Sequence, residues 1–151
     1  MHYTEGKIGR IFILRLHDGD RLPNVLETFA VDKKISSCLC LFLGGVKENG
    51  KVVVGPKDGN VIPVNPMVRL LNGVHEVYGI GTIFKDEKGI PKLHMHSSFG
   101  REDRTITGCI RMGIEIWEIG EIVILEITDS SAHRAIDRKT GFEILEVKDR
   151  I

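Results

Sequence analysis

The feature that most restricts the fold of this chain is a succession of strand-like segments joined by links too short for a helix. Each segment is rich in β-branched and apolar residues and is bounded by turn residues. In the second half of the chain these segments span residues 68–84, 91–100, 105–112, 115–129 and 142–147. A parallel crossover needs a dozen or more residues, so most of these strands must pair antiparallel. The sequence therefore predicts an α+β fold dominated by an antiparallel or mixed sheet.

The first half of the chain adds one clear helix to this sheet. Residues 21–34 carry apolar side chains at helical spacing, and Asp20 is in position to cap the N-terminus. Strands are predicted at 6–20 and at 35–46, the second of them buried and closed by Gly44 and Gly45. Shorter strands, limited by prolines, are predicted at 51–56 and 60–66. Because no long linker interrupts the chain, residues 1–151 are predicted to form a single domain with one or two helices.

The charge balance and the apolar runs of the chain argue against some classes of binding partner. The chain has 21 Lys+Arg and 21 Asp+Glu, a formal net charge of +0, and no basic run. Proteins that hold nucleic acid through its phosphates usually carry an excess of positive charge, so the charge argues against nucleic acid as a partner. No apolar run approaches the roughly 18 residues of a membrane span, and the N-terminus lacks a secretory signal. We therefore expect a cytoplasmic protein with reduced cysteines and no membrane partner, in which Cys38 and Cys40 lie on a buried strand.

The strongest candidate for a chemical site lies in residues 92–113. Successive side chains of a strand point to opposite faces, so His94 and His96 share one face. A symmetric hairpin centred between Glu102 and Asp103 places Cys109 directly opposite His96, where Cβ atoms are about 4.5 to 5.5 Å apart. Imidazole nitrogen and thiolate sulfur are both zinc ligands, so this pattern predicts a metal site. The alternative is two half-exposed histidines beside a buried cysteine.

A set of two histidines and one cysteine leaves one tetrahedral position open, as in catalytic zinc sites. The candidates for this position are Glu76, His75, His133 and water. Zinc is the predicted ion, and another divalent transition metal, such as nickel, iron or manganese, is the alternative.

Several pieces of the chain together are similar to the plants-and-prokaryotes conserved (PPC) domain family. These pieces are GRIFILRLHDGD, GVHEVYGIGTIF, LHMHSSFGRED with the following GCIRMG, and DRKTGFEIL. The resemblance covers about residues 9–147 and corresponds to the form of the domain that stands alone in prokaryotes. It implies an α+β fold and a homotrimer whose histidine-containing strands lie near the subunit boundaries.

The resemblance also implies more about the candidate metal site. The PPC domain is distantly similar to acetolactate decarboxylase, a zinc enzyme whose metal is held by a His-x-His strand and a third histidine downstream. The third position is often histidine in PPC domains as well, and here Cys109 stands in its place. Glu76 matches a glutamate of the family and could act beside the metal as an acid or base.

Three functional hypotheses follow. The leading one is a small metal-binding homotrimer without an assigned activity. The second is a metal-dependent lyase or decarboxylase-like enzyme acting on a small oxo-acid, with Glu76 and Arg101 as catalytic candidates and Arg101 contacting a small anionic ligand. A structural role for Glu76, and a solvated turn at 101–104, are the alternatives for these residues. The third hypothesis, a DNA-binding regulator, rests on the label of the family, and this chain lacks the Arg-Gly-Arg-Pro piece of an AT-hook.

Overall fold

The computed structural model describes residues 1–147, and the last four positions of the predicted domain lie outside this range. The elements, in chain order, are β1 (Lys7–Leu16), β2 (Arg21–Leu22), α1 (Asn24–Asp32), β3 (Ser37–Val46), β4 (Lys51–Pro56), β5 (Pro66–Leu70), β6 (His75–Lys85), β7 (Pro91–Arg101), β8 (Arg104–Cys109), β9 (Ile114–Thr128), β10 (His133–Ile136) and β11 (Glu143–Glu146). Strands dominate and a single short helix accompanies them, which confirms the predicted α+β class.

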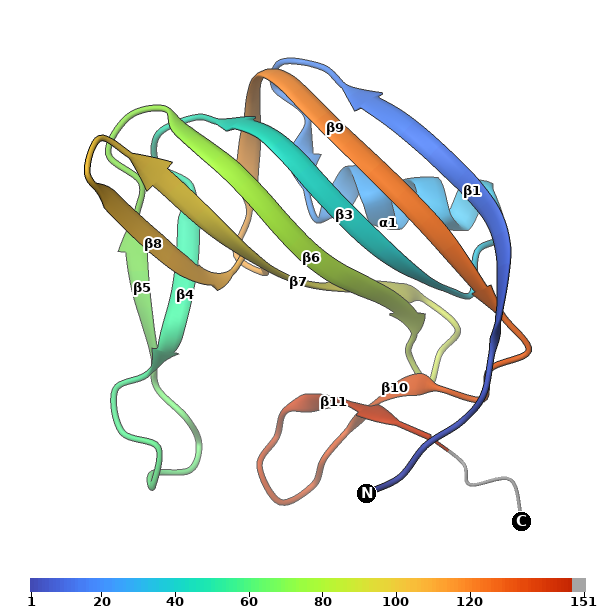
Figure 1. The fold of residues 1–151 in the computed structure, drawn as a ribbon. Helices are drawn as coiled ribbons and strands as arrows, with labels where there is room; N and C mark the ends of the chain where they lie inside the picture. The colour runs from blue at the N-terminus through green and yellow to red at the C-terminus, as the bar shows by residue number, and fades with distance from the viewer. Residues whose placement is uncertain (148–151) are drawn as a thin grey trace.

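One curved sheet organises the molecule. Its strand order is β1-β9-β3-β6-β7-β8-β4-β5, with β2 paired to the start of β9. All pairings between named strands of residues 1–147 are antiparallel. β10 and β11 form a separate hairpin that lies below the sheet in Figure 1, away from α1. Short links between neighbouring strands therefore produced antiparallel pairing, as expected.

The core lies on the face of the sheet that α1 covers. Leu26 and Ala30 of the helix pack there, and Glu27 accepts a hydrogen bond from the Leu93 N–H of β7 at 2.9 Å. Cys38 and Cys40 are fully buried on this face and unbridged, which confirms the prediction of a buried strand for this pair. The large side chains that fill the core include Phe42, Ile83, Met95, Phe99, Ile122 and Ile124.

The predicted N-cap of the helix is wrong. The helix begins at Asn24, Pro23 occupies the capping position, and no side chain caps it. The Asp20 carboxylate instead accepts a hydrogen bond from the His17 N–H at 2.8 Å. Because Arg21 and Leu22 first pair with β9, the helix starts later than the hydrophobic pattern suggests. Proline suits a helix start because it has no N–H to leave unsatisfied.

The predicted strand limits are partly wrong. β3 ends at Val46 as predicted, and Gly44 and Gly45 lie inside it, at a register shift against β9. Residues 60–65 form a loop, and the strand that follows β4 begins only at Pro66. Proline cannot donate to a strand ladder, so the prolines of this segment favour a loop over continuous pairing. Within the described residues, no helix is long and apolar enough to span a bilayer.

Candidate metal centre

β7 presents the two histidines on the face of the sheet opposite the helix. Along this strand Leu93, Met95 and Phe99 are buried, whereas His94 and His96 are exposed. The alternation is the ordinary two-residue period of a strand, in which the apolar set faces the core. The imidazoles therefore stand on the outer face of the sheet, as the sequence predicts.

The β7–β8 hairpin carries Cys109 to the same place. Arg101 pairs with Arg104 across a two-residue loop, and His96 pairs directly with Cys109. Glu102 has φ 56°, a left-handed conformation that this tight turn imposes on a residue other than glycine. The register predicted from the symmetry of the loop is confirmed, and β8 ends at the cysteine.

The three side chains converge on one point. One nitrogen of each histidine and the Cys109 sulfur all lie within 4.8 Å of one another. The two Nε2 atoms are 3.2 Å apart, and a tetrahedral zinc ion would hold two nitrogens about 3.3 Å apart, given Zn–N bonds near 2.0 to 2.1 Å. Cys109 is 3% exposed, so the residue is shielded from solvent. The two imidazoles lie beside its sulfur. Small side-chain rotations would place all three atoms at bonding distance from one ion.

The surroundings of His94 favour its neutral form. His94 is exposed as a residue, but partial desolvation of its imidazole lowers the pKa, and the nearby charges of Arg134, His96 and Arg111 lower it further. A metal ion binds neutral imidazole, so these groups keep His94 in the state that can act as a ligand.

None of the protein groups proposed for the fourth position joins the three ligands. In residues 1–147 the cluster contains no further His, Cys, Asp or Glu. His75 is buried on the opposite face, where its Nδ1 lies 2.9 Å from the Gly73 carbonyl oxygen. His133 lies 3.7 Å from the Glu146 carboxylate in the β10–β11 hairpin. Of the candidates for this position, water is the one that remains.

Glu76 and Arg101 lie apart from the three ligands. Glu76 shares the outer face, but it is four residues along β6 from Ile80, the partner of His96. At about 3.3 Å per residue that separation is roughly 13 Å. The Arg101 guanidinium donates to the Val74 carbonyl oxygen at 2.8 Å, at the far end of β7. Their predicted catalytic roles remain predictions. Any such role would require a ligand that extends along the strands from the candidate metal site to Glu76 or Arg101.

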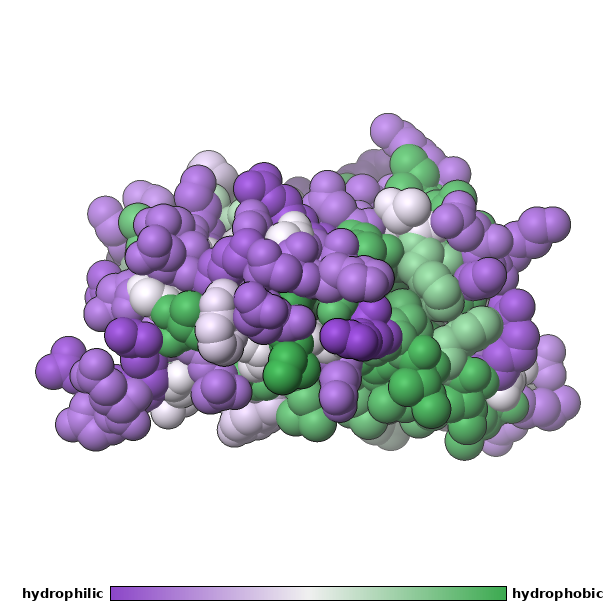
Figure 2. Space-filling model, turned by 90° about the horizontal axis from the view of Figure 1, so that it is seen from above, coloured by the Kyte–Doolittle hydropathy of each residue, from purple (hydrophilic) through white to green (hydrophobic). Residues whose placement is uncertain are grey.

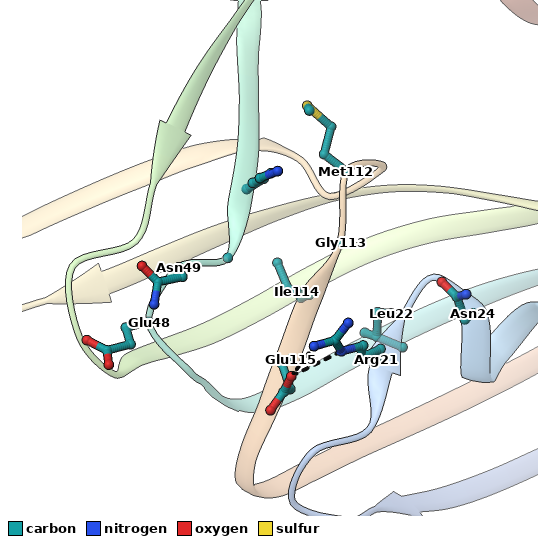
Figure 3. Close-up of a pocket in the computed structure, with 11 residues that line it drawn as sticks. Arg21, Leu22, Asn24, Glu48, Asn49, Met112, Gly113, Ile114 and Glu115 are labelled. Atoms are coloured by element: carbon teal, nitrogen blue, oxygen red, sulfur yellow. Dashed lines mark hydrogen bonds and ion pairs between the residues drawn. The ribbon is translucent and has the colours of Figure 1, made fainter.

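A separate hollow of about 370 Å³ lies between β2, the β3–β4 turn and the start of β9 (Figure 3). Arg21 pairs there with Glu115, with the Nη2 and Oε2 atoms 3.0 Å apart. Glu115 also contacts Lys47 at 3.0 Å. These charges neutralise one another, and none of the described residues that line the hollow is a histidine or a cysteine. It is therefore a weaker candidate for chemistry than the outer face of β7.

A larger pocket beside His94 joins the candidate segment 92–113 to a distant part of the chain that sequence reasoning did not connect with it. Arg134 is buried in β10, whereas Lys92 in β7 and Arg111 just after β8 flank the candidate ligands along the chain. In the turn that joins β10 to β11, the Asp137 carboxylate accepts a hydrogen bond from the Thr140 hydroxyl at 2.5 Å. Only the folded chain brings these segments together.

The family can now be assigned from the sequence as a whole. A family model described as the Plants and Prokaryotes Conserved (PCC) domain matches residues 3–128. The chain belongs to this family. The assignment confirms the resemblance to the PPC domain, while the more distant similarity to acetolactate decarboxylase remains a prediction. No curated protein matches the chain significantly.

Solved structures share the fold at low sequence identity. A PPC protein from Pyrococcus horikoshii is 22% identical with a TM-score of 0.83, covering 99% of this chain and 100% of its own. A metal-containing protein from Archaeoglobus fulgidus is 23% identical with a TM-score of 0.80, covering 95% and 98%. A protein from Bacteroides thetaiotaomicron that is proposed to bind DNA is 18% identical with a TM-score of 0.74, covering 94% and 97%. These similarities establish the PPC fold for the present chain.

Proposed function

We propose that this PPC-domain protein binds one divalent transition-metal ion, zinc above all, through His94, His96 and Cys109. The convergence of three ligand atoms within 4.8 Å carries the proposal. A thiolate together with two imidazoles suits zinc better than a hard cation such as magnesium, which prefers oxygen. The metal-containing protein of the same fold from Archaeoglobus fulgidus supports the same function.

We further propose that the protein works as a homotrimer, the assembly that the family resemblance implies. The outer face of the sheet supports self-association. Large apolar side chains are exposed on three strands of this face, β1, β3 and β6: Ile11, Ile13, Leu41, Leu43, Tyr78 and Ile80. Figure 2 shows apolar residues gathered on the right-hand side, where Figure 1 places β1 and β9, while most of the remaining visible surface is hydrophilic. Extensive exposed apolar patches mark sites of association.

Metal content tests the first proposal directly. Protein purified without added metal should contain about one zinc ion per chain by elemental analysis, because three positioned ligands retain zinc during purification. The substitutions Cys109→Ser and His96→Ala should each remove most of this metal. A purified, reduced wild-type protein without stoichiometric transition metal would contradict the proposal.

The matched control is His17→Ala. His17 is a histidine whose side chain is 84% exposed, and it lies outside the cluster. Its removal should leave the metal content unchanged. Loss of metal in this variant as well would show that the ion binds nonspecifically to histidines.

A second candidate function is that of a metal-dependent lyase on a small oxo-acid. The observation that favours it is the open coordination position, since no fourth protein ligand joins the cluster within residues 1–147. A metal ion with a free position can polarise a substrate carbonyl as a Lewis acid. Binding of DNA has less support, because the net charge of the chain is +0.

A further inference from the structure

A pocket of about 780 Å³ opens directly beside the candidate metal ligands. His94 and Cys109 form part of its wall, and the β10–β11 hairpin closes the other side. The hairpin contributes apolar side chains, namely Phe142, Ile144 and Leu145. The pocket therefore has a metal-binding edge and an apolar edge.

The charged side chains of this pocket are unbalanced. Lys92, Arg111 and Arg134 carry positive charge, whereas Glu143 is the one acidic residue among its described lining residues. The whole protein has a formal net charge of +0, so the excess is local. A cationic pocket of this kind attracts an anion.

Arg134 is the most constrained of these cations. The residue is only 5% exposed, and its guanidinium lies 5.6 Å from the centre of the Phe84 ring. Its Nη2 donates to the Thr82 hydroxyl at 3.0 Å, but its Nε has no hydrogen-bond partner within residues 1–147. None of the described carboxylates lies within ion-pairing distance, although Glu143 is near enough to oppose the effect of burial, which lowers the pKa of Arg134.

A buried guanidinium without a counter-ion is energetically costly, because burial removes its hydration without supplying a compensating charge. The chain tolerates this arrangement at the wall of a pocket that Arg111 also lines. An anion bound in the pocket would supply the missing charge. The burial of Arg134 therefore points to a ligand rather than to the stability of the empty fold.

We propose that the pocket binds a small organic carboxylate through Arg134 and Arg111, with the body of the ligand against Phe142 and Ile144. Guanidinium groups match carboxylates in shape and hydrogen bonding, and the apolar edge favours an organic anion over an inorganic one. The contact of this ligand with the metal rests on the proposed function. The pairing of the carboxylate with Arg134 and Arg111 does not rest on the proposed function. In this arrangement these two arginines, in place of Arg101, hold the anion.

Calorimetric titration with pyruvate tests the proposal on the full-length protein. Pyruvate should bind the wild type, and Arg134→Gln should weaken binding at least about tenfold, as loss of a charge-assisted hydrogen bond requires. Arg111→Gln, at an exposed position of the same pocket, should weaken binding in the same direction without threatening the fold. Arg104→Gln is the matched control, because the Arg104 side chain is 90% exposed and lies outside this pocket. Pyruvate binding by this variant should stay within about twofold of the wild type, the scatter expected for a surface change.

One further variant and one further ligand distinguish anion binding in the pocket from metal binding. His96→Ala should lose the metal and keep a weaker, Arg134-dependent affinity for pyruvate. Absence of pyruvate binding to the wild type, or binding unchanged in both Arg134→Gln and Arg111→Gln, would refute the pocket whatever the metal content. Inorganic phosphate bound as tightly as pyruvate would overturn the assignment to an organic carboxylate. The assignment would also be overturned if the wild type does not bind pyruvate and Arg134→Gln forms a smaller oligomer. A neighbouring subunit would then supply the counter-ion of Arg134.

Discussion

At the scale of single residues, the most tightly held ion pair joins the edge strand β1 to β9. The Arg10 Nε and Nη2 atoms donate to the two oxygens of Glu126, both at 2.7 Å, and the Arg10 backbone N–H donates to the same carboxylate at 3.0 Å. These bonds lower the pKa of Glu126 to about 2. The carboxylate side chain is 10% exposed, whereas the Arg10 side chain is 52% exposed, so solvent screens part of the interaction.

The pair predicts a specific pH dependence of stability. Because the pKa of Glu126 is lower in the folded protein than in the unfolded chain, its contribution is present above pH 4.5 and is lost as the pH falls toward about 2. Glu126→Gln should lower the free energy of unfolding by about 1–2 kcal/mol at pH 7 and flatten the acid limb of the stability curve. Urea denaturation between pH 2 and 7 measures both effects. Glu121→Gln, an exposed position on the same strand, is the control, and an equal loss there would refute the assignment to this pair.

At the scale of elements, the position of the candidate ligand Cys109 depends on how closely β8 approaches β4. Gly108 precedes Cys109, and a Cβ atom at this glycine would collide with the Val53 carbonyl oxygen and approach Val52 Cγ1 to 2.9 Å. Backbone atoms cannot move aside as a flexible side chain does. The glycine therefore permits the strand contact that holds the cysteine opposite His96.

Gly108→Ala should accordingly damage both the sheet and the metal site. We expect a loss of about 1–3 kcal/mol in stability, the usual range for overpacking, together with weaker zinc binding as Cys109 shifts. Chemical denaturation and competition with a zinc chelator measure the two effects. Gly59→Ala is the matched control, since a Cβ there meets no atom within 4 Å. Normal zinc affinity in Gly108→Ala would show that the position of Cys109 does not depend on this contact.

At the scale of the whole molecule, the outer face of the sheet unites the proposed interface with the proposed metal site. Ile80 is part of the apolar surface and pairs directly with His96 on the next strand. Association through this face would therefore bring a second subunit close to the metal ligands. That arrangement agrees with the family expectation of histidine-containing strands near subunit boundaries.

Ile13 lies on the edge strand β1, far across the sheet from the candidate ligands on β7 and β8. Ile13 on β1 is 84% exposed, and Ile13→Glu should dissociate the trimer because burying an unpaired carboxylate is costly. Sedimentation equilibrium should give three times the chain mass of 16.9 kDa for the wild type and a lower mass for the variant. Val31→Glu, at a position 57% exposed on the helix side, should remain trimeric. A monomeric wild type at micromolar concentration would disprove the assembly.

Local rules accounted for much of the fold and for the heart of the candidate site. Strand alternation predicted which side chains of β7 face outward, and the symmetry of a two-residue loop predicted that His96 opposes Cys109. Both rules depend only on neighbours along the chain. The same kind of rule failed at Asp20, where pairing of Arg21 and Leu22 with β9 took precedence over a local cap.

The tertiary structure alone decided what surrounds the candidate metal ligands. Arg134 lies 40 positions beyond His94 in the sequence, and nothing in its local pattern distinguishes it from a surface arginine. It becomes a wall of the pocket because the β10–β11 hairpin folds back toward β6, where Arg134 bonds to Thr82. The sequence by itself determined strand faces and hairpin register, because these follow from short-range backbone geometry. The burial of a lone guanidinium beside the ligands depends on packing between distant segments, which no local pattern encodes.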